Sequence, residues 1–357
     1  MEDVSYRFYT KTAEAWEAML RDLEKATVSI DFERYIFCND AVGQRFIDIF
    51  KQKAREGVAV RVLVDMVGSF SFYVSSVVRE LEDAGVQVKF FNPISPWRIA
   101  NFTSNFFRDH RKLIVIDDMI GYIGGTGIDL HTSNWRDTEV RFDGPIVTEM
   151  KRLFNRLWLS TLRQKFIRFL RSPFYFKHFD ILTNSPRLRE RHIYKAMIAT
   201  IRNATEYVYL TTPYFIPDLR FLRVLRLAAK KGIDVRLVVP KKSDYSFADN
   251  STRSYFTLIL KAGVRVYLYE PTMLHAKTVV VDDEWASVGT SNLDNVSFRY
   301  NYEMNVASTK PEFISELKQH FLADIEKATE VTYGEWIKRP IIQKCKEFIT
   351  WPFHDFF

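Results

Sequence analysis

Residues 109–125 read DHRKLIVIDDMIGYIGG, and residues 274–290 read LHAKTVVVDDEWASVGT. Both stretches contain His-x-Lys followed after four residues by Asp, with glycine seven residues after that Asp. The two copies lie 165 residues apart, which is the separation of His110 and His275. A single His-x-Lys is weak evidence, but a repeated constellation with the same internal spacing indicates a common cause. We predict one active site that is built from two halves.

Each copy predicts a β-hairpin with its reactive groups at the start of the first strand. Alternate side chains of a strand share a face, so His110 and Lys112 should project together, as should His275 and Lys277. The first strands, the turns and the return strands are expected at 113–116, 117–118 and 120–123, and at 278–281, 282–283 and 285–288. Two imidazoles and two ammonium groups with little acid among them suit a phosphate.

The two halves of the chain repeat beyond these hairpins. KATVSIDFERYIFCND (25–40) aligns with NATEYVYLTTPYFIPD (203–218), and AREGVAVRVLVD (54–65) aligns with AKKGIDVRLVVP (229–240). AGVQVKFFNP (84–93) likewise matches AGVRVYLYEP (262–271). The shared order is helix, strand, helix, strand, helix, strand and hairpin. We therefore predict an α/β protein of two pseudo-symmetric halves, each a mixed β-sheet flanked by helices, with one shared active site at their interface.

Length and composition limit the class of protein. A chain of 357 residues exceeds the usual size of a single core, and Cys38 and Cys345 have neither disulfide-framework nor metal-ligand spacing. The sequence contains no signal peptide and no apolar run of about 18 residues, so we expect a soluble or peripheral protein. The net charge of +7 favours an anionic partner, but does not choose between nucleic acid and an anionic membrane surface.

Two segments outside the repeat are basic and aromatic. The first half has 13 more residues before its histidine than the second half, in the stretch 94–109, which is either a packed surface loop or a contact for substrate or membrane. Residues 150–179 contain eight basic side chains, many aromatic ones and no acid. This pattern is typical of an amphipathic membrane-surface element, although a basic helix packed on the body by its aromatic face would share it.

The sequence also resembles a known protein family. The duplicated His-x-Lys-x4-Asp resembles the signature of the phospholipase D superfamily. WRDTEVRFDGPIV (135–147), LTNSPRLRER (182–191), TTPYFIPD (211–218) and SFRYNYEMN (297–305) are similar to segments of its bacterial cardiolipin synthase branch. The resemblance divides the chain into a first half (1–149), a basic amphipathic connecting segment (150–180), a second half (181–335) and a basic aromatic C-terminal tail (336–357).

The resemblance implies a two-step transfer through a phosphohistidine, without a metal or cofactor. One imidazole attacks phosphorus while the other protonates the departing oxygen and later deprotonates the incoming alcohol or water. By analogy with the family, His110 is the nucleophile and His275 the acid and base, although the sequence alone does not separate these roles. Lys112 and Lys277 would neutralise the phosphate oxygens.

A nucleophilic imidazole also needs its second nitrogen held by an acceptor. Asp137 lies 27 residues after His110, and Glu303 lies 28 residues after His275, at the positions where the family places an orienting carboxylate. The alternative is that Asp137 and Glu303 are ordinary surface charges. We expect the motif aspartates, Asp117 and Asp282, to support their turns and not to transfer protons.

Three further residues are candidates for contacts with the substrate phosphate. Seventeen residues after the histidine the family usually has asparagine, which the second half keeps as Asn292, whereas the first half has Gly127. Thr126 or a backbone amide of the glycine-rich turn could substitute in the first half. Asn305 is either a further polar contact beside Glu303 or a residue that supports the end of a strand.

Four functions fit these residues unequally. The resemblance favours a cardiolipin synthase, a phosphatidyltransferase with phosphatidylglycerol as substrate, acting as a peripheral protein on the cytoplasmic side of a bacterial membrane. A hydrolase or headgroup transferase on other phospholipids would use the same residues. A metal-independent nuclease is less favoured, so no nucleic acid partner is expected, because the interfacial aromatic residues have no evident use in it. A non-catalytic membrane-binding protein is least favoured, since both His-x-Lys pairs are intact.

Overall fold

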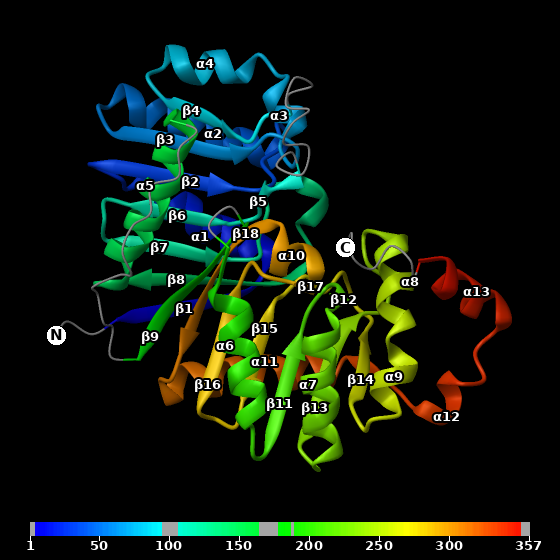
Figure 1. The fold of residues 1–357 in the computed structure, drawn as a ribbon. Helices are drawn as coiled ribbons and strands as arrows, with labels where there is room; N and C mark the ends of the chain where they lie inside the picture. The colour runs from blue at the N-terminus through cyan, green and yellow to red at the C-terminus, as the bar shows by residue number, and fades with distance from the viewer. Residues whose placement is uncertain (1–3, 95–105, 164–177, 187–188, 351–357) are drawn as a thin grey trace. The chain divides into compact units, whose positions relative to one another are not determined.

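The computed structural model describes residues 4–94, 106–163, 178–186 and 189–350. The chain divides into two compact units (Figure 1). The first contains Met1–Lys177, Ser185–Glu190 and Tyr300–Met304, and the second contains His178–Asn184, Arg191–Arg299 and Asn305–Phe357.

The first unit is built on a seven-stranded sheet in the order β1-β8-β7-β6-β2-β3-β4. The neighbours β2, β3 and β4 are parallel, and the remaining pairs are antiparallel, as expected for a mixed sheet. The strands are β1 (Ser5–Lys11), β2 (Ser29–Arg34), β3 (Ala59–Asp65), β4 (Gln87–Phe91), β6 (Leu113–Ile116), β7 (Ile120–Gly124) and β8 (Arg136–Asp143), with the short β5 (Arg108–Asp109) outside this order.

The second sheet has the order β10-β9-β18-β16-β15-β11-β13-β14-β19, with β5 paired to β18. Its strands are β9 (Phe179–Ser185), β10 (Glu190–Arg191), β11 (Tyr207–Thr211), β13 (Asp234–Pro240), β14 (Arg265–Tyr269), β15 (Thr278–Val281), β16 (Trp285–Gly289), β18 (Asn301–Ser308) and β19 (Ala328–Val331). A separate two-stranded pair joins β12 (Phe215–Ile216) to β17 (Leu293–Asp294).

The order of the strands confirms the repeat that the sequence predicts. The path β1-β8-β7-β6-β2-β3-β4 of the first unit recurs as β9-β18-β16-β15-β11-β13-β14. In both copies the motif hairpin, β6 with β7 or β15 with β16, is antiparallel and lies next to the first strand of the parallel set. The protein is therefore an α/β protein of two pseudo-symmetric halves.

Helices cover both faces of each sheet. In the first unit α1 (Thr12–Glu24), α2 (Ala41–Arg55) and α4 (Val77–Asp83) share one core with the sheet, and α5 (Ile146–Arg163) packs outside that core with its own buried side chains. In the second, α6 (His192–Asn203), α7 (Leu219–Lys230) and α9 (Phe256–Leu260) form the corresponding core, and α11 (Pro311–Ile325) takes the place of α5. The short or peripheral helices are α3 (Phe70–Tyr73), η2 (Leu130–Thr132), α8 (Ser246–Ser254), α10 (Asn295–Arg299), α12 (Tyr333–Trp336) and α13 (Ile341–Thr350).

The two motif aspartates shape the hairpin turns. Asp117 and Asp118 both have positive φ, 53° and 57°, and Asp282 and Asp283 both have φ of 54°. Two central residues with positive φ make a type I′ turn, which matches the twist of the strands, and aspartate tolerates this conformation better than most residues. The structure thus places the strands and turns of both hairpins where the sequence predicts them.

The Asp117 carboxylate also holds the start of the neighbouring strand. It accepts hydrogen bonds from the backbone amides of Thr27, Val28 and Ser29 at 2.7–2.8 Å. Asp282 accepts the corresponding bonds from the amides of residues 205, 206 and 207. Burial alone would raise the pKa of both carboxyl groups, but these bonds lower it below the usual value. The contacts are those of supporting residues, as we expect for both aspartates.

We expect Asp117→Ala and Asp282→Ala each to lower the free energy of unfolding by about 1–3 kcal/mol, because three amides lose their acceptor. The turnover number of the folded variants should stay within about threefold of the parent, since neither carboxylate moves a proton in the proposed reaction. Urea unfolding and steady-state assays on the same preparations measure both quantities. A fall in turnover at unchanged stability would contradict the supporting role.

The pH dependence of this contribution has a definite sign. A carboxyl group with a lowered folded pKa stabilises the protein above its unfolded pKa, about 4, and loses that contribution as the pH falls through the folded value. Asp117→Ala should therefore destabilise the protein most at neutral pH and least in acid. Unfolding measured between neutral pH and about pH 3 checks this trend.

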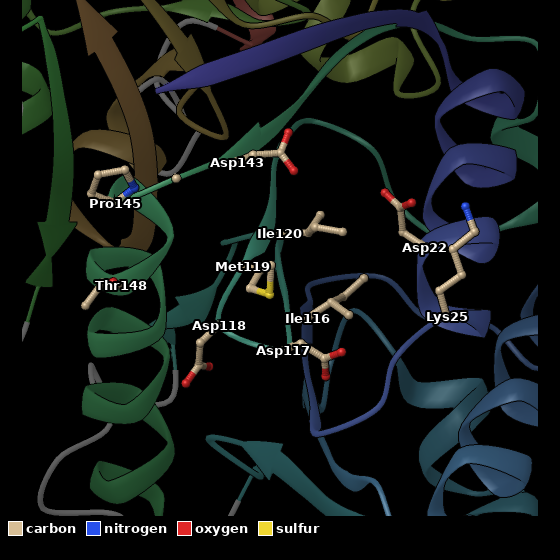
Figure 2. A pocket seen from close by; sticks show the side chains of 11 residues that line it. Asp22, Lys25, Ile116, Asp117, Asp118, Met119, Ile120, Asp143, Pro145 and Thr148 are labelled. Atoms are coloured by element: carbon tan, nitrogen blue, oxygen red, sulfur yellow. The ribbon is translucent and has the colours of Figure 1, made fainter. Parts of the chain in front are cut away.

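A hollow of about 420 Å³ surrounds the first of these turns (Figure 2). It is lined by residues of the turn, of the C-terminal end of α1 and of the start of α5, including Asp22, Asp118 and Thr148. His110 precedes β6, whereas the turn follows β6, so this hollow lies at the opposite end of the strand from the histidine. It therefore does not mark the reaction site.

The first part of the basic connecting segment is a core helix, contrary to the expectation of a membrane-surface element. Within α5 the side chains of Met150, Phe154 and Trp158 are buried. Three of its basic residues form ion pairs. Lys151 pairs with Asp31 and Asp118, and Arg156 pairs with Glu190, all from other elements, whereas Arg152 pairs with Glu149 of the same helix. The basic helix packed on the body by its aromatic face is the correct alternative here. The rest of the segment, 164–177, lies outside the described residues.

Among the described residues, no helix combines the length and the apolar character that crossing a membrane requires.

Candidate active site

His110 lies between β5 and β6 and is held by a carboxylate from a distant part of the chain. Both carboxylate oxygens of Glu303 lie 3.0 Å from its Nδ1 atom. Glu303 is fully buried on β18, and Asn301 Nδ2 donates to its Oε1 at 3.3 Å. A carboxylate at Nδ1 favours the tautomer with the proton on Nδ1, which leaves the lone pair on Nε2. The first histidine is therefore arranged to react through Nε2.

This pairing differs from the one that spacing along the chain suggests. Counting from each histidine assigns Asp137 to His110 and Glu303 to His275. In the structure the carboxylate on His110 is Glu303, which is 193 residues away. The reason is that β18 pairs with β5 directly before the histidine, and His110 N donates to Tyr302 O at 3.0 Å. The prediction that a carboxylate holds His110 is confirmed, but the residue is Glu303, which spacing assigns to His275.

Lys112 is buried beside the same histidine. Its Nζ atom donates to the carbonyl oxygen of His110 at 2.9 Å and lies 5.6 Å from the centre of the Tyr35 ring. The Tyr35 ring also meets the imidazole of His110 edge to face, with 5.0 Å between centroids. Burial lowers the pKa of Lys112 to about 8, although the charges of Glu303 and Asp137 oppose this. Lys112 thus carries a charge at neutral pH that a small rise in pH would remove.

We expect the rate of the wild-type enzyme to fall as the pH rises through about 8, because Lys112 then loses the charge that would balance the phosphate. Arginine keeps its charge in this range, so Lys112→Arg should shift the alkaline fall to higher pH, whatever its absolute activity. Profiles of kcat against pH for the two proteins measure this. Coincident alkaline limbs would show that Lys112 does not control the fall.

The stability of the protein should change in the opposite direction. The folded pKa of Lys112, about 8, is below its unfolded value of about 10.4. The unfolded chain therefore binds more protons between these values, and stability contributed by this group rises with pH across that window. Lys112→Met should remove this rise.

The second motif repeats the local geometry in the second unit. Lys277 is buried and its Nζ atom donates to the carbonyl oxygen of His275, as Lys112 does with His110. His275 and Lys277 precede β15, so the reactive pairs lie immediately before their strands. The first strands themselves lie at 113–116 and 278–281, where the sequence predicts them, and each reactive pair lies just before its strand and not within it.

A buried charge network positions the first motif and was missed in the sequence. Arg111, the residue between His110 and Lys112, donates to both oxygens of Glu33 at 2.5 and 2.8 Å. Asp65 accepts from the Asp109 amide at 2.9 Å and pairs with Arg108 at 3.3 Å. Burial, with the nearby Glu33 charge, raises the pKa of Asp109 well above its usual value. The available signal was the pair of acidic residues at the carboxyl ends of two neighbouring strands, Glu33 as the second-last residue of β2 and Asp65 as the last residue of β3.

Asp137 occupies on β8 the place that Glu303 occupies on β18. Gly124 of β7 lies opposite Glu139 of β8, and Gly289 of β16 lies opposite Asn305 of β18. Asp137 and Glu303 each lie two residues before the second member of these pairs. A Cβ atom at Gly125 would lie 2.1 Å from Asp137 Oδ1. Glycine at 125 is therefore required by the approach of the Asp137 side chain. The buried Asp137 is not an ordinary surface charge.

The structure gives Asn305 a supporting task that differs from substrate contact. Its Oδ1 accepts from the amides of Thr290 and Ser291, and its Nδ2 donates to Ser287. The side chain is fully buried, so it holds the turn after β16. These contacts favour the alternative in which Asn305 supports the end of the strand.

Glu139 performs the same task in the first unit. Its Oε2 accepts from the amide of Thr126 at 3.3 Å, and its Oε1 lies 3.3 Å from Nη2 of the buried Arg34. Burial raises the pKa of Glu139 to about 7, while the Arg34 charge opposes it. The Thr126 amide is thus engaged within the protein. The side-chain oxygen of Asn292, in contrast, is buried and makes no hydrogen bond among the described residues.

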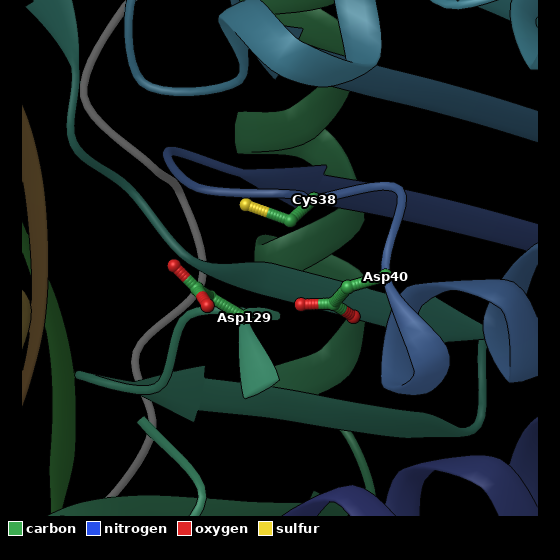
Figure 3. A group of neighbouring side chains, drawn as sticks. All are labelled: Cys38, Asp40 and Asp129. Carbon is green, nitrogen blue, oxygen red and sulfur yellow. The ribbon is translucent and has the colours of Figure 1, made fainter. Parts of the chain in front are cut away.

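One group of potential metal ligands lies in the first unit, in the segments that follow β2 and β7 (Figure 3). Cys38 Sγ and carboxylate oxygens of Asp40 and Asp129 lie within 4.8 Å of one another. Sequence spacing did not reveal this grouping. Both carboxylates already cap chain segments, Asp40 with the amides of Val42 and Gly43 and Asp129 with that of His131. We assign them to these caps. The insertion at 94–109 lies mainly outside the described residues, apart from its ends.

Comparisons with known proteins identify the family. Residues 19–158 and 197–325 match the model for the PLD-like domain of cardiolipin synthase. The major cardiolipin synthase ClsA of Bacillus subtilis is 36% identical over 98% of this chain and 74% of its own length. The cardiolipin synthase of Oceanobacillus iheyensis is 36% identical over 96% of this chain and 73% of its own.

A solved structure agrees on the fold. Phosphatidylserine synthase of Haemophilus influenzae superposes with a TM-score of 0.76 over 98% of this chain and 92% of its own, at 16% identity. At that identity the likeness concerns the fold alone. The duplicated motif and the repeated sheet are consistent with the sequence matches. The chain therefore belongs to the cardiolipin synthase family of phospholipase D-like proteins.

Proposed function

We propose that this protein is a phosphatidyltransferase that makes cardiolipin from two molecules of phosphatidylglycerol and releases glycerol. The observation that carries the proposal is a buried His110 whose Nδ1 is held by Glu303, in a chain of this family. A neutral imidazole with its lone pair on Nε2 is a competent nucleophile toward phosphorus.

In the first step His110 Nε2 attacks the phosphorus of one phosphatidylglycerol. The bond from phosphorus to the headgroup oxygen breaks, His275 gives that oxygen a proton, and glycerol leaves. In the second step His275 takes the proton from a headgroup hydroxyl of another phosphatidylglycerol. That oxygen attacks the phosphohistidine, which yields cardiolipin and restores His110. That both histidines serve one reaction centre stays a prediction.

The remaining candidates support these steps. Lys112 and Lys277 would balance the negative charge that develops on the phosphate oxygens. Because Asp137 corresponds in position to Glu303, we assign it the same task of holding a catalytic imidazole. Asn292, with its buried side-chain oxygen and amide, is the candidate for phosphate contact in the second half, and Thr126 with its glycine-rich turn is the candidate in the first. No metal or cofactor takes part in this scheme.

The substrate places the enzyme at a membrane. A phospholipid with long acyl chains is available only in a bilayer, and the net charge of +7 suits an anionic surface. We assign the protein to the cytoplasmic side of a bacterial membrane as a peripheral protein, with no nucleic acid partner. The related hydrolase or headgroup transferase on other phospholipids remains the alternative within the same chemistry.

One experiment separates the lipid function from a nuclease function. The purified protein is incubated with phosphatidylglycerol vesicles and, in parallel, with single- and double-stranded DNA, all in the presence of a metal chelator. We expect lipid turnover and intact DNA. Cleavage of DNA without turnover of lipid would reject the proposed function, and activity only without chelator would reject the metal-independent scheme.

A further inference from the structure

Helix α13 presents its apolar face to solvent and its polar face to the protein. Glu347 and Thr350 are buried and the half-buried Gln343 bonds to α8, whereas the large apolar side chains are exposed. Ile341 is 71% exposed, Ile342 68%, Phe348 78% and Ile349 63%. A helix packed on a globular body normally does the reverse. This inversion requires an explanation, because exposed apolar surface of this extent marks a contact with another phase or molecule.

Polar contacts fix the helix in this orientation. Gln343 donates to Asn250 of α8 at 3.2 Å and to Glu347 at 3.1 Å. Arg339 forms an ion pair with Glu347 at 2.6 Å and stacks over Trp336, whose indole donates to Thr257. Figure 1 shows α13 beside α8 at the margin of the second unit. The apolar face is therefore held outward by specific bonds.

The outward face has the layout of an interfacial helix. At about 100° per residue, the exposed apolar positions and the exposed Cys345 fall within an arc of about 120°. Lys344 and Lys346 flank this arc on its two sides, and Lys338 lies just before the helix. Among the described residues none of these three lysines takes part in an ion pair. Apolar side chains flanked by lysines suit a bilayer surface, where the ammonium groups reach anionic headgroups.

We infer that α13 docks the protein on an anionic phospholipid bilayer, with Ile341, Ile342, Phe348 and Ile349 entering the boundary between headgroups and acyl chains. The inference rests on the proposed function, since it supplies the surface on which the lipid substrate is found. The charge of this face indicates what it binds. Lys344 and Lys346 would attract anionic headgroups, whereas the same lysines on a second copy of the protein would repel them.

Cys345 provides a direct probe of this contact. In a Cys38→Ser protein, a polarity-sensitive fluorophore is attached to Cys345, which is exposed on the apolar face. We expect its emission to shift to the blue on phosphatidylglycerol vesicles and to be quenched by lipids brominated on their acyl chains. The shift should be much smaller on phosphatidylcholine vesicles and should weaken as salt is raised. A blue-shifted emission in buffer alone would overturn the inference, because protein would then cover the face.

Substitutions test whether the face provides affinity. Ile342→Asp and Phe348→Asp should each weaken binding to phosphatidylglycerol vesicles about tenfold or more. Each removes one inserted apolar side chain and places on the protein a negative charge that the anionic headgroups repel. The matched control is Met119→Asp, a residue of the first unit that is 68% exposed at the hairpin turn. It should bind vesicles as the parent does. Equal binding of all three variants and the parent would overturn the inference.

Turnover separates docking from chemistry. Ile342→Asp and Phe348→Asp should lose activity on vesicles but keep it on phosphatidylglycerol dispersed in detergent micelles, where no bilayer has to be reached. Turnover of vesicle lipid by the parent without any blue shift would reject the docking face and leave the proposed function intact. A blue shift without turnover in either form would support the docking face and reject the proposed function.

Discussion

Replacing His110 by alanine should lower kcat by a factor of about 10⁴ or more and abolish the covalent intermediate, because the variant lacks the Nε2 lone pair that attacks phosphorus in the proposed reaction. Melting temperatures of the variant and the parent separate this loss of rate from a loss of folding. His131→Ala is a suitable control, since His131 is an exposed histidine of the same unit. It should retain full activity.

The roles of the two histidines separate with a substrate whose leaving group needs no proton. A phosphatidyl ester of p-nitrophenol should react with His275→Ala in a single burst, because His110 attacks normally and the phosphohistidine then waits for a base. His110→Ala should give no burst. The reverse outcome, with a phosphorylated protein that still forms in His110→Ala, would transfer the role of nucleophile to His275.

Glu303→Gln should lower kcat by a factor of about 10²–10⁴ with little change in KM. Glu303 is fully buried and acts through His110, so it positions the nucleophile and does not touch the substrate. Glutamine has no charge with which to stabilise the positive imidazole of the phosphohistidine. When its amide nitrogen faces Nδ1, it also favours the tautomer that places the proton on Nε2 and blocks attack.

Three further variants distinguish positioning from a general structural effect. Glu303→Asp keeps the charge and should recover part of the lost rate. Glu149→Gln, which removes a buried carboxylate paired with Arg152 on α5, should cost stability and not rate. Asp137→Asn should lower kcat as Glu303→Gln does. If Glu303→Gln lowers stability and rate no more than Glu149→Gln, the positioning role is wrong.

The parts of the fold that were predictable are those set by local sequence. The hairpins were placed to within a residue, because Asp117-Asp118 and Asp282-Asp283 break two apolar runs with residues that tolerate positive φ. The repeat was visible because glycine stops and strand patterns recur at a nearly constant spacing. The family followed from the motif, and the comparisons confirm it.

The partner of His110 was not predictable by counting along the chain. Glu303 reaches it only because β18 pairs in parallel with β5. That pairing joins residues almost two hundred positions apart and leaves no mark on local spacing. Glu33 and Asp65 likewise meet Arg111 and Arg108 only in the folded chain, at separations of 78 and 43 residues.

Composition did not predict which charged and apolar side chains are exposed, for a related reason. A count of basic residues over 150–179 contains no acid, yet folding brings Asp31, Asp118 and Glu190 to the α5 part of that segment and neutralises it. Conversely, the basic aromatic composition of the C-terminal tail at 336–357 does not show which of its side chains are exposed. Which side of α13 faces outward depends on its bonds to Asn250 and Arg339, and no helical pattern specifies that orientation.

The most direct test of the account is the fate of both halves of phosphatidylglycerol in a single reaction. The lipid is labelled with one isotope in the headgroup glycerol and another in the phosphorus, and presented as vesicles with a metal chelator. The account predicts one free glycerol for each cardiolipin formed, with both phosphorus labels in the cardiolipin. Release of glycerol with phosphatidic acid as the only phosphorus-labelled product would contradict it, because water and not a second lipid would then accept the phosphatidyl group.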